Sequence, residues 1–105
     1  MKPIRLQLSR QAGFNVQALS RRTNGLPAIV VNRRSRWGNP HHIGFCPVCG
    51  VEHTREEAIA EFKAECASEE VRERVRSELR GHNLACNCRA DEACHADHLL
   101  EIANA

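Results

Sequence analysis

The chain of 105 residues is organised around the stretch NLACNCRADEACH, residues 83–95. A short apolar run ends in Cys86 and Cys88, which are one residue apart, and a polar turn follows them. Cys94 and His95 then stand where a new helix should begin. This order places three thiols and an imidazole at one junction between a strand and a helix. We therefore expect a functional site at this junction.

Apolar runs before this stretch predict the other strands of a sheet. Residues 4–8 alternate apolar and polar side chains, which fits a strand with one face in water. A short helical turn is expected at 15–20. Residues 28–31 are apolar throughout and rich in β-branched side chains, which is typical of a central strand covered on both faces. Together with a strand at 83–87, these runs predict a small, mostly parallel sheet of about three strands.

Polar caps and apolar spacings predict the helices that flank this sheet. Thr54 and Glu57 have the spacing of a capping box, and Ser68 precedes a second helical stretch. Apolar residues recur at helical spacing behind both caps, at Ala58, Ile59, Phe62 and Cys66 and then at Val71, Val75 and Leu79. A closing helix is expected over 93–103, with Asp91 as its N-cap. Its inward-facing residues are expected to be Ala96, Leu99, Leu100 and Ala103.

The order of these elements brings two distant segments together. A strand, two helices, a strand and a helix imply a right-handed crossover, so the strands at 28–33 and 83–87 should run parallel. Their carboxyl ends then open on the same side of the sheet, where open α/β folds bind ligands. Those ends are the Trp-Gly-Asn-Pro turn at 37–40 and the junction at 88–95. We expect one cleft between this turn and this junction.

A second group of cysteines and histidines has the pattern of a zinc knuckle. The segment Cys46-Pro-Val-Cys49-Gly makes a tight turn that aims two sulfurs at one point, and His53 stands four residues after Cys49. His42, four residues before Cys46, is the expected fourth ligand, with His41 as the alternative. A redox dithiol is the rival interpretation, but no helix begins at Cys46 to stabilise a thiolate.

The net charge of +2 hides an uneven distribution of charge. Residues 1–36 carry eight basic and no acidic side chains, whereas the rest of the chain carries seven basic and thirteen acidic ones. This split suggests a basic face for a phosphate-bearing small molecule or nucleic acid, unless the two halves simply attract each other. The guanidinium groups expected to grip an anion belong to Arg33, Arg34, Arg36 and Arg89. Trp37 would stack on a base or pack in the core, and Asn39 would shape the pocket.

Three interpretations of the late cysteines stay open. In the first, three sulfurs and an imidazole form a complete zinc shell, from Cys86, Cys88, Cys94 and His95. In the second, Cys86 and Cys88 point to opposite faces of the strand, so that one is buried and Cys88 joins Cys94 at the cleft. Cys94 would then be a reactive or ligand-fixing thiol with His95, since a helix N-terminus lowers the pKa of a thiol. In the third, all of them are small buried side chains.

A set of motifs spread over nearly the whole chain supports a family resemblance. These motifs are Arg5-Leu6-Gln7-Leu8, Val30-Val31-Asn32-Arg33, Trp37-Gly38-Asn39-Pro40, Thr54-Arg55-Glu56-Glu57-Ala58, Leu79-Arg80-Gly81, Leu84-Ala85-Cys86-Asn87-Cys88, Cys94-His95, Asp97 and Leu99-Leu100. In this order they resemble the domain of unknown function 4326 family, common in bacteria and their phages. The resemblance implies a small α/β fold and no established reaction.

The chain departs from the usual pattern of that family at three places. Members usually carry an aromatic residue after the Trp-Gly-Asn-Pro turn and a Trp between the two late cysteines, where this chain has His41 and Asn87. A base-stacking wall would therefore be weaker here. Many members lack the insert at 45–53, which suggests that the Cys46 and Cys49 knuckle is a local staple, separate from the shared site.

The setting predicted for this chain is cytoplasmic. The basic N-terminus is not followed by an apolar signal segment, and no stretch has the length of a transmembrane helix. In a cytosolic setting, six cysteines favour metal or thiol chemistry over a disulfide framework. The sequence thus predicts a single α/β domain over residues 1–105, with a zinc-knuckle loop at 41–53.

The function predicted for this domain is the binding of a nucleotide or nucleic-acid-derived ligand in the cleft, and in one interpretation its chemical modification. Zinc is the expected cofactor, and Cys88 and Arg89 join the residues expected to contact the ligand. The alternative is a non-catalytic, zinc-stabilised interaction module of the phage accessory type, which binds nucleic acid or a host protein. A thiol redox protein is the third class.

Overall fold

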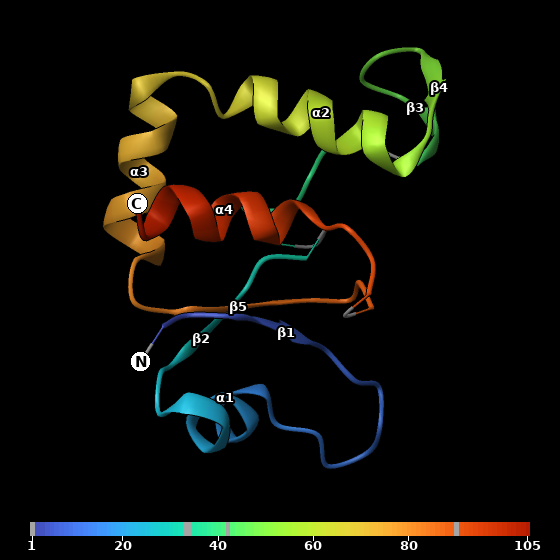
Figure 1. The fold of residues 1–105 in the computed structure, drawn as a ribbon. Helices are drawn as coiled ribbons and strands as arrows, with labels where there is room; N and C mark the ends of the chain where they lie inside the picture. Colours follow the sequence, from blue (N-terminus) through green and yellow to red (C-terminus); the bar gives the residue numbers. More distant parts are fainter. Residues whose placement is uncertain (1, 33–34, 42, 90) are drawn as a thin grey trace.

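Three parallel strands form the main sheet of the protein. The computed structural model describes residues 2–32, 35–41, 43–89 and 91–105 (Figure 1). The strands lie in the order β1 (Arg5–Gln7), β5 (Asn83–Cys86) and β2 (Ala28–Val30), and both neighbouring pairs run parallel. The predicted parallel pairing of the second and last strands is therefore confirmed, as is a small sheet of three strands in an α/β fold.

Helices cover both faces of this sheet (Figure 1). α1 (Val16–Asn24) lies against one face, and α4 (His95–Ala103) lies on the other with α3 (Glu69–Leu79) beside it. α2 (Arg55–Glu65) follows a separate antiparallel hairpin of β3 (Gly44–Cys46) and β4 (Val51–His53). Within the described ranges, no helix has the length and apolar character needed to cross a membrane.

The central strand is β5, and not β2 as the apolar run at 28–31 suggested. Both edges of β5 are paired, since Asn83 donates to the carbonyl of Pro27 and Leu84 donates to the carbonyl of Ile4. All four residues of β5 are buried, whereas Ile29 and Val30 of β2 are only half-buried. The prediction was wrong because an apolar run indicates burial and not strand order, and β1 takes the second edge of β5.

Side chains along β5 alternate between two apolar clusters. Leu84 and Cys86 belong to the larger cluster, which includes residues of α3 and α4, whereas Ala85 packs with Leu6 and Ala28 in the smaller cluster on the other face. This alternation follows from the two-residue repeat of an extended strand. The Cys86 side chain therefore lies on the face of β5 that α4 covers.

A buried amide ties the first residues of β5 to the N-terminal part of the chain. The Asn83 side chain is fully buried, accepts hydrogen bonds from the Ile4 backbone and the Asn24 side chain, and donates to Ser20 and Asn24. Its partners thus lie beside β1 and in α1. Buried polar groups need such partners, so this network fixes how α1 and β1 sit on β5.

The predicted caps of α2 and α3 are confirmed, but that of α4 is wrong. Thr54 and Glu57 form the full capping box, and Ser68 accepts the expected bond at the start of α3. The N-cap of α4 is Cys94 rather than Asp91. A tight turn precedes it, in which Glu92 bonds back to Arg89 through both its backbone N–H and its side chain. This turn delays the helix. Along α4, Ile102 is buried instead of Leu100, which is half-buried.

Candidate functional site

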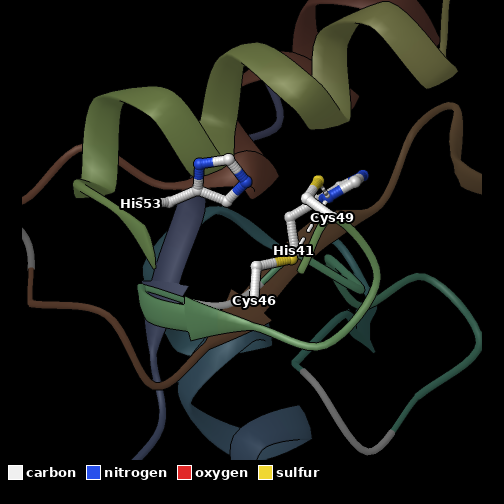
Figure 2. A group of neighbouring side chains, drawn as sticks. All are labelled: His41, Cys46, Cys49 and His53. Carbon is white, nitrogen blue, oxygen red and sulfur yellow. Dashed lines mark hydrogen bonds between the residues drawn. The ribbon is translucent and has the colours of Figure 1, made fainter. Parts of the chain in front are cut away.

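The hairpin gathers two histidines and two cysteines at one point, here named the hairpin cluster. Cys46 ends β3 and His53 ends β4, while Cys49 lies in the turn between them and His41 precedes the hairpin (Figure 2). One ligand atom from each residue lies within 4.8 Å of all the others. Gly50, whose φ of 74° falls in the left-handed region, closes the turn by donating to the carbonyl of Cys46. The cluster could therefore hold a metal ion.

The contacts inside the hairpin cluster support this. Nδ1 of His41 lies 3.3 Å from Sγ of Cys49 and 3.6 Å from Sγ of Cys46. Burial lowers the pKa of His41, but the hydrogen bond to Cys46 and the nearby carboxylate of Glu65 outweigh it, so the pKa is raised overall. Both ring nitrogens of His53 are buried, and neither has a hydrogen-bond partner among the residues that the structure describes. Since buried polar atoms need a partner, one of these nitrogens fits the role of a metal ligand.

The position of His41 bears on the predicted fourth ligand. His42 lies outside the described residues, whereas His41 takes part in the cluster. The backbone N–H of His41 donates to the Asn39 side chain, and its Nε2 lies 3.1 Å from a carboxylate oxygen of Glu65 in α2, without the alignment of a hydrogen bond. These contacts orient Nδ1 towards the sulfurs. Such outer partners are typical of metal-bound histidines.

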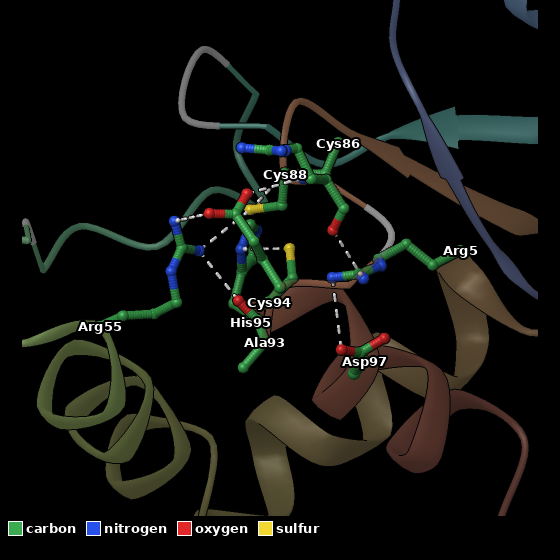
Figure 3. Close-up of polar contacts among 10 residues, drawn as sticks. Arg5, Arg55, Cys86, Cys88, Ala93, Cys94, His95 and Asp97 are labelled. Atoms are coloured by element: carbon green, nitrogen blue, oxygen red, sulfur yellow. Dashed lines mark hydrogen bonds and ion pairs between the residues drawn. The ribbon is translucent and has the colours of Figure 1, made fainter.

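The second group, here named the strand-end cluster, contains the three late cysteines (Figure 3). Cys86 ends β5, Cys94 caps α4, and Cys88 lies between them. Their sulfurs all lie within 4.8 Å of one another, and those of Cys86 and Cys88 are 3.9 Å apart. The expectation that Cys86 and Cys88 point to opposite faces was wrong. Side chains two residues apart share a face of a strand, and β5 in any case ends at Cys86.

Charged groups from three elements surround the strand-end cluster. Arg55 of α2 donates to the carbonyl of Ala93 at 2.9 Å and to Sγ of Cys88 at 3.6 Å, and it pairs with Glu92 at 3.1 Å. On the other side, Arg5 of β1 donates to the carbonyl of Arg89 and pairs with Asp97 of α4. These contacts hold the 86–94 segment between the sheet and two helices.

The three sulfurs differ in how readily they lose a proton. The hydrogen bond from Cys86, together with the backbone N–H of Ala96, lowers the pKa of Cys94 well below its usual range. The bond to Cys94, together with burial, raises the pKa of Cys86. Burial likewise raises the pKa of Cys88. Cys94 is therefore the thiol of this cluster that loses its proton first.

His95 is positioned by backbone and ring contacts. Its Nε2 lies 2.6 Å from the carbonyl oxygen of Val31, so this nitrogen carries a proton, because a carbonyl only accepts. Nδ1 then faces Sγ of Cys94 at 3.7 Å. The ring packs edge-on against Phe62, with centroids 5.2 Å apart. His95 thus orients Cys94 from within the core.

A cavity of about 320 Å³, the strand-end cavity, opens between the two clusters. Its wall includes residues that follow each parallel strand: Arg10 after β1, Asn32 after β2, and Asn87 after β5. The remaining lining residues are Asn39, His41, Ile43, Arg55, Ala58, Ile59, Cys86, Cys88, Ala93, Cys94 and His95. The predicted site residues Asn39, Cys88, Cys94 and His95 are therefore brought together here.

Trp37 lines a different cavity. With Gly38 and Pro40 it borders a space of about 370 Å³ against α2 and α3. The guanidinium of Arg36 lies over the Trp37 ring, 4.9 Å from its centroid, and also pairs with Glu78. Of the Trp-Gly-Asn-Pro turn, only Asn39 lines the strand-end cavity, where it donates to the carbonyl of Ala58.

Other site residues fall into three groups. Arg33 and Arg34 lie outside the described residues. Arg89 is exposed, and its described contacts are made by its backbone. The Arg89 carbonyl accepts a hydrogen bond from Arg5, and the Arg89 N–H donates to the Glu92 side chain. Sequence reasoning missed Arg10, Arg55, Asn32 and Asn87 in the cavity wall. Arg10, Asn32 and Asn87 could have been predicted to line the cavity, because each comes at or just after the end of a predicted strand. For Arg55, the sequence shows only that it lies in the first turn of a helix.

Comparison with known proteins gives one match. Searches of curated proteins and of solved structures find nothing that matches the chain. The model of a family described as Domain of unknown function (DUF4326) matches residues 16–105. Because this match covers far more than half of the chain, the protein belongs to the DUF4326 family.

Proposed function

We propose that this domain binds a nucleotide or another phosphate-bearing ligand in the strand-end cavity, and that zinc in the hairpin cluster fixes one wall of that cavity. One observation carries the proposal: residues following all three parallel strands line the same cavity. The carboxyl ends of parallel strands are where open α/β folds bind ligands.

The chemistry of the wall fits a polar, anionic ligand. Arg10 supplies a guanidinium group, a group that binds phosphate oxygens through two parallel hydrogen bonds. Arg55, whose guanidinium donates to Ala93 and Glu92, adds positive charge to the wall. Three amide side chains, from Asn32, Asn39 and Asn87, offer both donors and acceptors for a base or a sugar. Asn32 already donates to Asn87 at 3.1 Å, so this bond joins two segments of the wall. The cavity volume lies at the lower end of the range of about 300–1,000 Å³ typical of ligand pockets.

Zinc is the metal that fits the hairpin cluster. Two thiolates and two imidazoles make a tetrahedral structural zinc site. His41 belongs both to this cluster and to the cavity wall. A metal bound there would hold His41 and the adjoining segment at the rim of the cavity.

The test is an NMR titration of the zinc-loaded protein with adenosine, guanosine, cytidine and uridine monophosphates, and with inorganic phosphate. Backbone amide shifts are expected around Asn32, Asn39 and Asn87. Arg10→Ala should weaken binding about tenfold or more, because a charge-assisted hydrogen bond is lost. Arg36→Ala is the matched control, since Arg36 lines the other cavity and should leave the affinity unchanged. Absence of shifts with every probe, or shifts confined to the Trp37 cavity, would reject the proposal.

The alternative, a nucleic-acid-binding module without catalysis, is favoured by a separate observation. Arg21 and Arg22 are exposed in the last turn of α1, on the face of the sheet opposite α4. A single-stranded oligonucleotide added in the same NMR experiment would then shift α1 amides, with a strong dependence on salt concentration. Binding that depends on Arg21 and Arg22 but not on Arg10 would support this alternative over the cavity.

A further inference from the structure

We propose that Cys86, Cys88 and Cys94 bind a second divalent metal ion of the zinc type, with its fourth coordination position open to the strand-end cavity. Three sulfurs from two separate elements meet at this point, inside a cavity that the hairpin cluster borders from another side. The site goes beyond the proposed ligand binding and does not require it.

The spacing of the sulfurs fits a tetrahedral thiolate site. With zinc–sulfur bonds of about 2.3 Å, two thiolates on one zinc ion lie about 3.8 Å apart. The sulfurs of Cys86 and Cys88 are 3.9 Å apart, and that of Cys94 lies within 4.8 Å of both. A shift of no more than about 1 Å at Cys94, within reach of a side-chain rotation, completes the three-sulfur face.

The core and one arginine position the three sulfurs. Cys86 and Cys94 are buried members of the larger apolar cluster, at the end of the central strand and at the first residue before α4. Cys88, which is half-buried, is held by the Arg55 guanidinium. A preformed arrangement of this kind lowers the ordering cost of binding a metal ion.

Charge balance at the site also favours a metal. Three thiolates around one divalent ion carry a net charge of −1. Arg55, 3.6 Å from Cys88, and the N-terminus of α4, whose Ala96 N–H faces Cys94, offset this charge. On binding, the thiol protons of the ligands pass to solvent, and no electron is transferred. Neighbours that orient ligands in this way are typical of protein metal sites.

The fourth position is the part that concerns function. Among the described residues, the group of ligand atoms that meet here comprises three sulfurs only. His95 bonds Val31 through Nε2, and its Nδ1 lies 3.7 Å from Sγ of Cys94. Neither ring nitrogen belongs to the group of ligand atoms that lie within 4.8 Å of one another, so His95 does not complete the shell. Structural zinc sites have four protein ligands, whereas catalytic sites keep three and leave one position for water or substrate. The strand-end cluster therefore has the composition of an open site.

Native mass spectrometry of the zinc-loaded chain, purified under reducing conditions, tests the assignment. The wild type is expected to hold two zinc ions, and Cys88→Ser and Cys49→Ser are each expected to hold one. Cys94→Ser provides a second strand-end variant. Far-ultraviolet circular dichroism and a urea transition establish that each variant is folded. A single zinc ion in the wild type that disappears in Cys49→Ser would overturn the assignment, as would a mass lower by two hydrogen atoms, which marks a disulfide in place of a metal.

Cobalt in the Cys49→Ser protein then reports on the strand-end cluster alone. Thiolate-to-cobalt charge-transfer bands are expected, and they should disappear in the Cys49→Ser/Cys88→Ser double variant. Added imidazole should shift the visible bands if the fourth position is open. Unchanged bands would show a closed shell and would overturn that part of the proposal. These readouts do not depend on nucleotide titration, so a failure of the metal site and a failure of ligand binding remain distinguishable.

Discussion

The hairpin cluster and the strand-end cluster use similar ligands on different scaffolds. The hairpin cluster draws four ligands from residues 41–53, and the hairpin that carries it leaves apolar side chains in water, with Phe45, Val48 and Val51 each more than half exposed. The strand-end cluster draws three sulfurs from β5 and the start of α4, where Cys86 and Cys94 belong to the main apolar cluster.

This difference shows what a metal would contribute in each place. A short hairpin with little buried apolar surface is not stable by itself, so a closed four-ligand shell would supply its stability. The strand-end cluster is already positioned by the core, so a metal there would contribute a reactive coordination position more than stability. One cluster would thus support the cavity wall and the other would face the ligand.

The largest expected effect comes from removing one ligand of the hairpin cluster. Cys49→Ser takes away an exposed sulfur without leaving a hole in the core. Residues 44–53 should then lose all measurable protection from hydrogen exchange, because the proposed zinc ion would supply most of their stability. The amides of β5 should keep their protection from hydrogen exchange. Hydrogen exchange followed by mass spectrometry measures the protection of both segments, with Cys88→Ser as the matched control. Equal loss in the hairpin and in β5 would contradict the division between the two scaffolds.

A smaller effect is expected from the buried amide that anchors the strand-end scaffold. Asn83→Ala leaves Ile4, Ser20 and Asn24 without their buried partner, and should cost about 2–4 kcal/mol in the free energy of unfolding. Urea denaturation measures this. Asn104→Ala, which removes an exposed amide, should cost under about 1 kcal/mol. Zinc binding by the hairpin cluster should survive at a urea concentration that unfolds neither protein. A cost for Asn83→Ala no larger than that of the control would show that the network does not hold the scaffold.

Local spacing explains why much of the fold and of the hairpin cluster could be predicted from the sequence. The capping box at Thr54, the cap at Ser68 and the parallel pairing of β2 with β5 depend on residues a few positions apart or on a general handedness rule. Cys46, Cys49 and His53 lie within one hairpin, so their convergence follows from a single turn. Short-range chemistry of this kind is visible in a single sequence.

Features that depend on packing between distant segments were not predictable. The second neighbour of β5 is β1, about eighty positions away in the sequence. The pattern of residues 4–8 predicts a strand but does not predict which strand it pairs with. Trp37 lines the cavity against α2 and α3 and not the strand-end cavity, because its neighbours are set by where those helices lie. The start of α4 depends on a turn between Arg89 and Glu92 that a search for an N-cap does not reveal.

The smallest expected effect concerns Arg55, whose guanidinium donates to a sulfur of the strand-end cluster. Arg55→Gln removes the charge next to Cys88 and weakens the contacts to Glu92 and to the carbonyl of Ala93. The zinc affinity of the strand-end cluster should fall about 10- to 100-fold, as expected when a group that orients metal ligands is lost. The affinity of the hairpin cluster should not change. Competition with a chelating zinc dye, in the Cys49→Ser and Cys88→Ser backgrounds, measures each site separately.

Two control variants separate charge from helix stability. Arg55→Lys should restore part of the zinc affinity by restoring the charge. Arg74→Ala, which breaks a surface pair with Glu70, should leave the zinc affinity of both sites unchanged. Equal losses at both sites would mean that Arg55 acts through the stability of α2 and not through the sulfurs.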